Sequence, residues 1–234
     1  ELVGDIGVAI QLIERNGSMT SIVTAGVESE PSRTALDRMV LRPGDLIHIA
    51  ASDLTTPHSA MVLAGWGAAL PASVRLVVSV SPAVEQVPVE SWRQLLKRAD
   101  IVTMNVREAA ALSSILATHE PGTGIRNLMK PEAALVRRTG IMGCELQREQ
   151  GAERIQVPAF ETRVADTAGV GDTHIATMCA ALLKGKDIEE ACSLANAAAA
   201  IAISHESALP VPTLEQILRV VKEGKATGLT SQKA

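Results

Sequence analysis

Short apolar runs alternate with amphipathic segments through the middle of the chain, and this alternation limits the folds that the chain can adopt. The pairs are DLIHIA (45–50) with PHSAMVLAGWGAAL (57–70), VRLVVSVS (74–81) with VESWRQLLKRA (89–99), and DIVTMN (100–105) with REAAALSSILATH (107–119). In the second amphipathic segment Trp92, Leu95 and Leu96 share one helical face. Continuous apolar strands interleaved with helices predict an α/β fold, with a mostly parallel central sheet and helices on both faces.

Both ends of the chain depart from this rhythm. Near the start, GVAIQLIE (7–14) and SMTSIVTAG (18–26) flank an Asn-Gly pair, which predicts a β hairpin over 7–26. Residues 133–160 contain glycine turns and predict three short strands at an antiparallel edge. Helices are expected over 175–184, from 187 to about 205, and over 213–222, the last opened by a capping box from Thr213 to Gln216. We expect a single α/β domain over 1–234.

Composition excludes several classes of function. The chain has 22 basic and 26 acidic residues with no basic stripe, and aromatic residues make up 1% of it. Because nucleic-acid binders use positive grooves and stacked aromatic rings, nucleic acid is not an expected partner. No apolar run free of charge reaches membrane-spanning length and no signal peptide is evident, so we expect a cytoplasmic protein with no membrane partner. Three cysteines without a CxxC pair indicate buried thiols.

The stretch ETRVADTAGVGDTH (161–174) places two aspartates around two glycines, just before an Ala/Leu-rich helix. Gly169 and Gly171 let the backbone turn sharply and approach a ligand closely. A helix that begins at about Val170 to Asp172 points unpaired N–H groups at such a ligand and forms an anion hole for a phosphate. The Asp172 carboxylate would then accept a proton from a substrate hydroxyl. The alternative is a capped helix N-terminus without chemistry.

Four stretches, in order along the chain, are similar to motifs of the ribokinase-like (PfkB) carbohydrate kinases. The longest resembles the signature D-T-x-G-A-G-D, with Val170 in place of Ala; the matching positions are Asp166, Thr167, Gly169, Gly171 and Asp172. MNVREA (104–109) resembles an N-x-x-E motif, and RRTGIMG (137–143) resembles a T-x-G-x-x-G nucleotide loop with Arg138 in place of Thr. LANAAAAIAISHESALPVP (194–212) resembles the late helix and the loop after it.

This resemblance implies a fold and a set of site residues. The fold is the ribokinase-like sheet with a partial β lid near the N-terminus, formed here by the 7–26 hairpin. The resemblance covers roughly residues 4–224 and leaves out the family's N-terminal portion, which carries the sugar-binding groups. Asp172 is implied as the catalytic base, with the anion hole at Gly169, Val170 and Gly171. ATP and Mg²⁺ are implied as cofactors; the residues implied to bind them are Asn105, Glu108 (Mg²⁺, through water), Arg138, Gly140, Gly143 and Asn196.

Each of these roles has a structural alternative. Asn105 and Glu108 also fit a strand-end turn followed by a helix first turn, and the glycines of the nucleotide loop fit a plain β-turn. Arg138 fits an exposed strand arginine as well as a phosphate contact, and Asn196 fits a buried side chain bonded to backbone. His174 is interpreted as a packed histidine and not as a catalyst.

The family often binds a monovalent cation such as K⁺ beside the anion hole. By position, the ligands implied here are Asp166, Ala168, Ala202, His205 and Ser207. The resemblance also implies a homodimer formed through the lid, because such dimers are common in the family.

The leading hypothesis is therefore an ATP-dependent kinase that phosphorylates a hydroxyl of a small sugar. A nucleoside or vitamin-type kinase of the same fold is an alternative. A binding protein without turnover is a third hypothesis, motivated by the changed residues Arg138, Val170 and Ser79.

Overall fold

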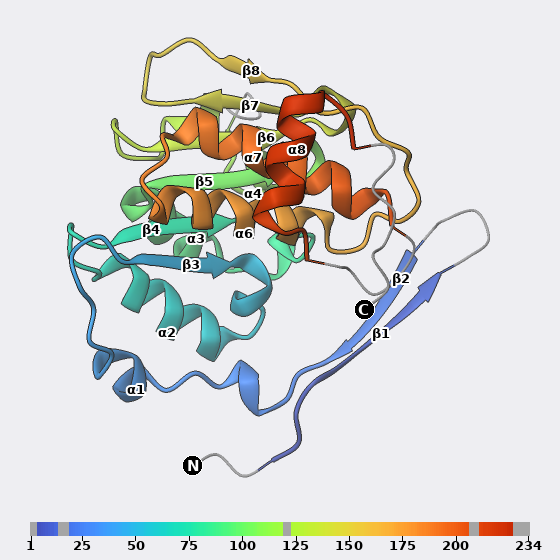
Figure 1. Cartoon of the computed structure of the whole chain (residues 1–234). Coiled ribbons are helices and arrows are strands. Elements are labelled where there is room, and N and C mark those ends of the chain that lie inside the picture. Colours follow the sequence, from blue (N-terminus) through green and yellow to red (C-terminus); the bar gives the residue numbers. More distant parts are fainter. Residues whose placement is uncertain (1–3, 14–18, 119–122, 206–210, 227–234) are drawn as a thin grey trace.

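Six strands form one sheet in the order β3-β4-β5-β6-β7-β8 (Figure 1). The computed structural model describes residues 4–13, 19–118, 123–205 and 211–226. The strands are β3 (Leu46–Ala50), β4 (Arg75–Ser79), β5 (Ile101–Asn105), β6 (Ala134–Arg138), β7 (Cys144–Gln147) and β8 (Ile155–Val157). Strands β3 to β6 are parallel, whereas β7 and β8 join the edge antiparallel, which confirms the mostly parallel sheet. The predicted antiparallel edge of three strands is confirmed by β6, β7 and β8, and β6 also pairs parallel with β5, which joins this edge to the rest of the sheet.

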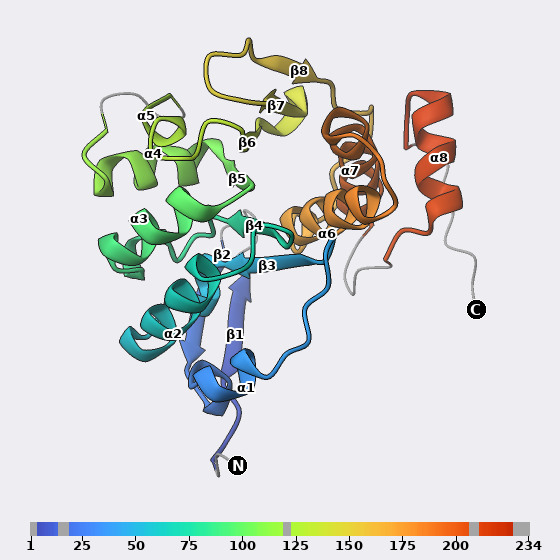
Figure 2. The ribbon, with the colours of Figure 1, turned by 90° about the vertical axis from the view of Figure 1, so that its left-hand side faces the viewer.

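The helices cover both faces of the sheet (Figure 2). On one face lie α2 (Pro57–Ala68), α3 (Val89–Arg98) and α4 (Val106–Ile115), and on the other α6 (Val170–Leu183), α7 (Ile188–Ile203) and α8 (Leu214–Glu223). Strand side chains alternate between two cores: Leu76 and Val78 pack in the first, and Val77 packs in the second beneath α6 and α7. Continuous burial on both faces explains why these strands read as unbroken apolar runs.

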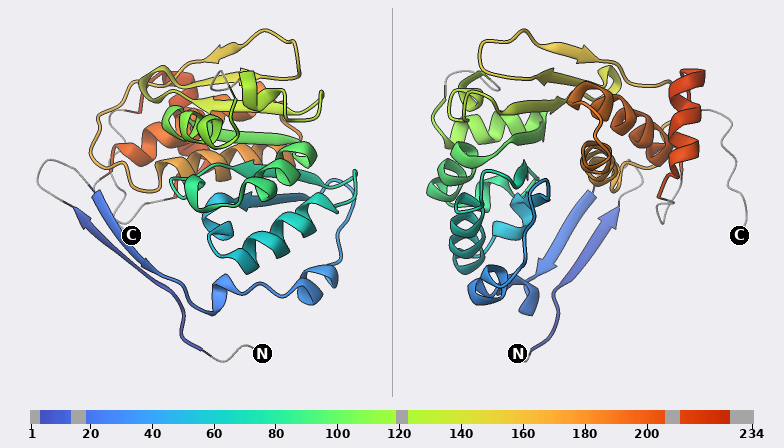
Figure 3. Two further views of the ribbon diagram at one scale, coloured as in Figure 1. Left: turned by 180° about the vertical axis from the view of Figure 1, so that it is seen from behind. Right: turned by 60° about the vertical axis from the view of Figure 1, so that its left-hand side comes forward.

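The N-terminal hairpin lies outside these layers. Strand β1 (Val8–Ile13) pairs antiparallel with β2 (Met19–Thr24), from Val8 opposite Thr24 to Ile13 opposite Met19. The two strands project away from the sheet (Figure 3). The predicted hairpin is thus confirmed in its strands, while the Asn-Gly turn lies outside the described residues. The hairpin leads into the short helix α1 (Arg33–Asp37).

Local signals set the helix boundaries. Helix α6 begins at Val170, inside the predicted window. Helix α8 carries the expected capping box: the Gln216 amide donates to Thr213 Oγ1 (3.3 Å), and the Thr213 amide donates to Gln216 Oε1 (2.8 Å). None of the helices in the described ranges is long and apolar enough to span a bilayer. The cysteines are free and buried, as predicted.

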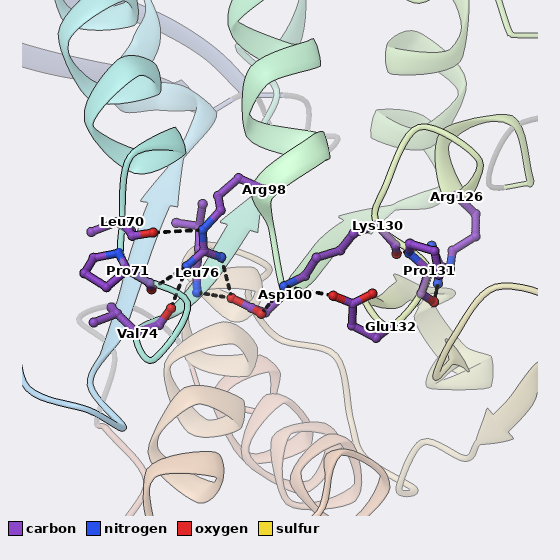
Figure 4. Close-up of polar contacts among 10 residues, drawn as sticks. All are labelled: Leu70, Pro71, Val74, Leu76, Arg98, Asp100, Arg126, Lys130, Pro131 and Glu132. Atoms are coloured by element: carbon purple, nitrogen blue, oxygen red, sulfur yellow. Dashed lines mark hydrogen bonds and ion pairs between the residues drawn. The ribbon is translucent and has the colours of Figure 1, made fainter.

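A polar network ties the amino ends of the strands together around Asp100, which directly precedes β5 (Figure 4). Asp100 accepts hydrogen bonds from the Leu76 amide (2.7 Å), from Arg98 (2.9 Å) and from Lys130 (2.6 Å). Arg98 also donates to carbonyls of the loop between α2 and β4, among them that of Val74 (2.8 Å). These contacts link β4, α3 and the loop before β6, and they fix the parallel strands in register.

Candidate active site

The N-terminus of α6 is built on a glycine turn. Gly169 caps the helix with φ 65° and ψ 1°, a left-handed conformation that favours glycine. Asp166 Oδ1 accepts the Ala168 amide (2.9 Å) and stabilises the approach to this turn. The first amides of the helix have no acceptor within it, so they present partial positive charge. Asp172 stands in this first turn with an exposed side chain that accepts no hydrogen bond from the described residues.

Asn105 and Glu108 form a capping box where β5 passes into α4. The Asn105 side-chain oxygen accepts the Glu108 amide (2.8 Å), and Glu108 Oε2 accepts the Asn105 amide (2.7 Å). The alternative for this motif, a strand-end turn followed by the first turn of a helix, is therefore present. These hydrogen bonds do not use Glu108 Oε1, which accepts no hydrogen bond from the part of the chain that the structure describes. One carboxylate oxygen remains for a ligand.

Arg138 joins this box to the anion-hole turn. It is the last residue of β6 and lies opposite Asn105 in the strand register. Its Nη2 donates to Glu108 Oε2 (2.9 Å), and its Nη1 donates to the carbonyl of Gly171 (3.3 Å). The Arg138 side chain is 14% exposed, so the alternative of an exposed strand arginine is wrong. One guanidinium thus connects β6, α4 and α6 beside the helix N-terminus.

The site concentrates negative charge at its rim. Burial raises the pKa of Glu108, and the Asn105 amide and Arg138 oppose this shift by stabilising the carboxylate. The Asp172 charge adds to the rise in the Glu108 pKa. Arg138 forms an ion pair with Glu108.

His48 and Ser79 belong to the same region and were not predicted as site residues. His48 Nε2 lies 2.8 Å from Ser79 Oγ, across neighbouring strands β3 and β4. Desolvation lowers the pKa of His48, while the charges of Asp53 and Asp172 raise it in part. The signal in the sequence was a polar residue within each of two apolar strands, LIHIA and RLVVS.

The predicted nucleotide loop is a tight turn between β6 and β7. The Thr139 amide donates to the Gly143 carbonyl (2.8 Å), and the Gly143 amide donates to the Gly140 carbonyl (2.9 Å). Gly140 has φ 66° and Gly143 φ 91°, both in the left-handed region. A Cβ on Gly143 would lie 2.2 Å from the Val157 carbonyl oxygen, whereas one on Gly140 would meet no atom within 4 Å. Close approach to β8 therefore explains Gly143.

Asn196 lies in the interior on α7. It is 6% exposed, and its side-chain nitrogen donates to the carbonyls of Val157 and Pro158, both at 3.0 Å. Its side-chain oxygen pairs with His174 Nε2 (3.1 Å), and His174 is 3% exposed. The predicted packing of His174 is confirmed. The buried, backbone-bonded alternative describes the position of Asn196.

The segments predicted to hold a monovalent cation lie side by side. The amides of Ala165 and Asp166 donate to the Ile203 carbonyl (2.8 and 3.2 Å), which brings the loop before α6 to the end of α7. His205 Nδ1 lies 2.8 Å from the Ile201 carbonyl oxygen, and the His205 amide donates to the Ala202 carbonyl (3.3 Å). Ser207 lies outside the described residues.

The donor set at the site fits Mg²⁺ bound largely through water. Within the described ranges, no three His, Cys, Asp or Glu side chains gather into a metal-binding group. Mg²⁺ nevertheless needs only one or two carboxylates when substrate phosphates and waters complete its shell, and Glu108 Oε1 is available. A hollow of about 210 Å³ lies elsewhere, beside α1 and α2, and none of the site residues lines it.

Comparison with known proteins identifies the family of the chain. The family model described as pfkB family carbohydrate kinase matches residues 4–214. The uncharacterized sugar kinase YegV of Escherichia coli K12 is 29% identical over 217 residues, which are 92% of this chain and 66% of that protein. The chain thus spans slightly less than two thirds of this curated relative.

Solved structures share the fold. A ribokinase from Thermotoga maritima superposes with a TM-score of 0.74 at 19% identity, covering 95% of this chain and 71% of the other. A nucleoside kinase from Burkholderia thailandensis, solved in complex with inosine, also gives a TM-score of 0.74, at 17% identity, covering 94% of this chain and 69% of the other. At these identities the likeness establishes the fold alone.

Proposed function

Because the chain belongs to the pfkB family of carbohydrate kinases, we propose that it transfers the γ-phosphate of ATP to a hydroxyl of a small carbohydrate. The observation that carries this proposal is the exposed Asp172 carboxylate in the first turn of α6, directly after the left-handed Gly169 turn. This arrangement puts a proton acceptor beside a set of amides suited to a phosphoryl group.

Asp172 is the proposed general base. It takes the proton from the attacking hydroxyl of the acceptor, while the amides at Val170 and Gly171, set by the Gly169 turn, hold the phosphoryl group. Arg138 places a fixed positive charge at this turn through its bond to the Gly171 carbonyl. Phosphoryl transfer depends mainly on positioning and on stabilising charge, and these residues supply both.

Glu108 and Asn105 would orient Mg²⁺ through its waters on the side of α4. When bound, Mg²⁺ neutralises charge on the phosphates of ATP. The loop at Gly140 and Gly143 would lie along the nucleotide. Asn196 would act on an adenine pocket only indirectly, by fixing the carbonyls of Val157 and Pro158.

The remaining family features enter as part of the same proposal. The loop at Asp166 and Ala168 would hold K⁺ with the end of α7, at Ala202, His205 and Ser207. The β1–β2 hairpin would act as a partial lid and as the contact of a homodimer. The place of action would be the cytoplasm.

The test is an ADP-release assay with a panel of acceptors: D-ribose, D-fructose and inosine. Acceptor-dependent ADP release that falls in the Asp172→Asn variant supports the proposal. Undiminished activity in that variant removes Asp172 from the mechanism. Calorimetric binding of ATP without turnover of any acceptor favours a binding protein instead.

A nucleoside kinase is the second candidate. It stays a candidate because the ribokinase and the nucleoside kinase superpose with equal TM-scores, so the fold does not separate the two acceptors. A higher kcat/KM for inosine than for either sugar would select it.

A further inference from the structure

The sheet face beneath α6 carries a polar pair where the core is otherwise apolar. Ser79, the last residue of β4, shares this face with Val77 and is 3% exposed. Its hydroxyl lies 2.8 Å from His48 Nε2 on β3. Because a buried hydroxyl is costly without a partner, this contact fixes both side chains. The imidazole is thereby held in one orientation.

The surroundings of His48 and the register of β3 and β4 show which end of the sheet its ring faces. Asp53 lies in the 3₁₀ turn after β3 (Ala51–Leu54), and its Oδ2 accepts the Ala50 amide (3.1 Å) at the carboxyl end of the strand. Asp172 lies at the start of α6, over the same sheet face. On β4 the register partner of His48 is Val77, and Ser79 lies two residues further toward the carboxyl end of that strand. The contact with Ser79 therefore directs the ring to the carboxyl end of the sheet, where the proposed phosphoryl transfer occurs.

One ring nitrogen of His48 is left for a ligand. Nε2 is used by Ser79 in a partly buried contact, whereas Nδ1 makes no hydrogen bond within the described ranges, and the residue keeps surface exposed to solvent. We propose that His48, fixed by Ser79, is a substrate-binding residue whose Nδ1 hydrogen-bonds a hydroxyl of the acceptor beside the one that Asp172 deprotonates. This inference rests on the proposed function.

The chemistry of the pair suits recognition of a polyhydroxylated acceptor. Neutral imidazole donates from one nitrogen and accepts at the other, and the Ser79 hydroxyl adapts to either tautomer. Desolvation favours the neutral ring by lowering the His48 pKa. A neutral ring also leaves the Asp172 carboxylate available, because it does not form an ion pair with it.

The first test is independent of turnover. NMR follows the His48 C2 proton of the whole protein through a pH titration, with His48→Gln used to assign the signal. Asp172→Asn and Asp53→Asn should each lower the His48 pKa, because each removes a negative charge that raises it. Addition of D-ribose, D-fructose or inosine should shift this signal for the acceptor that binds. A titration unchanged in Asp172→Asn, or a binding acceptor that leaves the signal in place, overturns the inference.

The second test uses the acceptor that the panel identifies. His48→Gln and Ser79→Ala should raise KM for the acceptor roughly 3- to 10-fold, as for one lost hydrogen bond, and leave KM for ATP unchanged. His58→Gln is the matched control, because His58 is exposed on α2 and contacts Glu30 and the Pro31 carbonyl instead. An unchanged acceptor KM, or an equal rise in KM for ATP, contradicts the inference. If no acceptor is phosphorylated, the proposed function fails while the titration still decides on His48.

Discussion

At the scale of single residues, Arg138 connects more of the site than any motif suggests. Its guanidinium bonds Glu108 on α4 and the Gly171 carbonyl on α6 from the end of β6. Glu108 is 6% exposed, so its carboxylate depends on this partner. The family motif has Thr at this position, so it does not predict the Arg138–Glu108 pair. The two residues are also 30 positions apart in the sequence, and no local pattern connects them.

Replacing Arg138 should therefore destabilise the fold as well as the site. Arg138→Thr leaves the buried Glu108 carboxylate without its cation, and we expect a loss of about 3 kcal/mol in the free energy of unfolding at neutral pH. The Glu108 pKa should rise further, because Arg138 now opposes the effect of burial. The loss should shrink as the pH falls and Glu108 becomes neutral. Urea unfolding across pH measures this.

Arg137→Thr is the matched control for that experiment. Arg137 lies beside Arg138 on β6 but pairs with Glu145 on β7, and both of those side chains are more exposed than the Glu108 pair. We expect a loss of about 1 kcal/mol or less. Equal losses for the two variants would contradict the role given to the Glu108 pair.

At the scale of elements, glycines fix the turns that deliver the site. Gly169 allows α6 to start at Val170, and Gly143 allows the loop after β6 to pass close to β8. The apolar periodicity was enough to predict most strands and helices, because the spacing of apolar residues within one segment shows which of its faces is buried. The parallel pairing of β6 with β5 was not predictable in this way, because α4 separates the two strands in the sequence.

The two glycines of the loop after β6 should respond differently to alanine. Both positions cost about 1–2 kcal/mol for a left-handed alanine. Gly143→Ala adds a contact of 2.2 Å with the Val157 carbonyl, whereas Gly140→Ala meets no atom. We expect Gly143→Ala to be the more destabilising variant and to raise KM for ATP. Thermal unfolding and ATP kinetics compare them, and equal stabilities would show that the loop relaxes freely.

At the scale of the whole molecule, the two ends of the sheet carry different groups of polar residues. The carboxyl ends gather Asp172, Glu108, Arg138 and His48, and the amino ends are held by the Asp100 network (Figure 4). The sequence identified the first group in part, through motifs with local spacing. It could not reveal the His48–Ser79 contact, nor the bonds of Asp100 to Arg98 and Lys130, because folding creates these contacts between segments.

Asp100 should contribute stability that depends on pH. Burial raises its pKa, but the hydrogen bonds from Lys130, Leu76 and Arg98 outweigh burial and hold the pKa below its usual value of 3.8. A lowered folded pKa means that the stabilisation is complete above 3.8 and is lost as the pH falls through the folded value. Asp100→Asn should cost about 1–3 kcal/mol at neutral pH and less in acid. A loss of stability that does not depend on pH would contradict this account. The kinetic constants of Asp100→Asn should equal those of the unaltered protein, because Asp100 lies at the opposite end of the sheet from Asp172.

The central claim is that Asp172 acts as the base at an amide-lined anion hole. The most direct measurement is kcat of Asp172→Asn against the unaltered protein, with ATP affinity measured by calorimetry on both. We predict a fall of about 10²- to 10⁴-fold in kcat with ATP affinity retained. A kcat within about threefold of the unaltered protein, with the same acceptor, would contradict the claim.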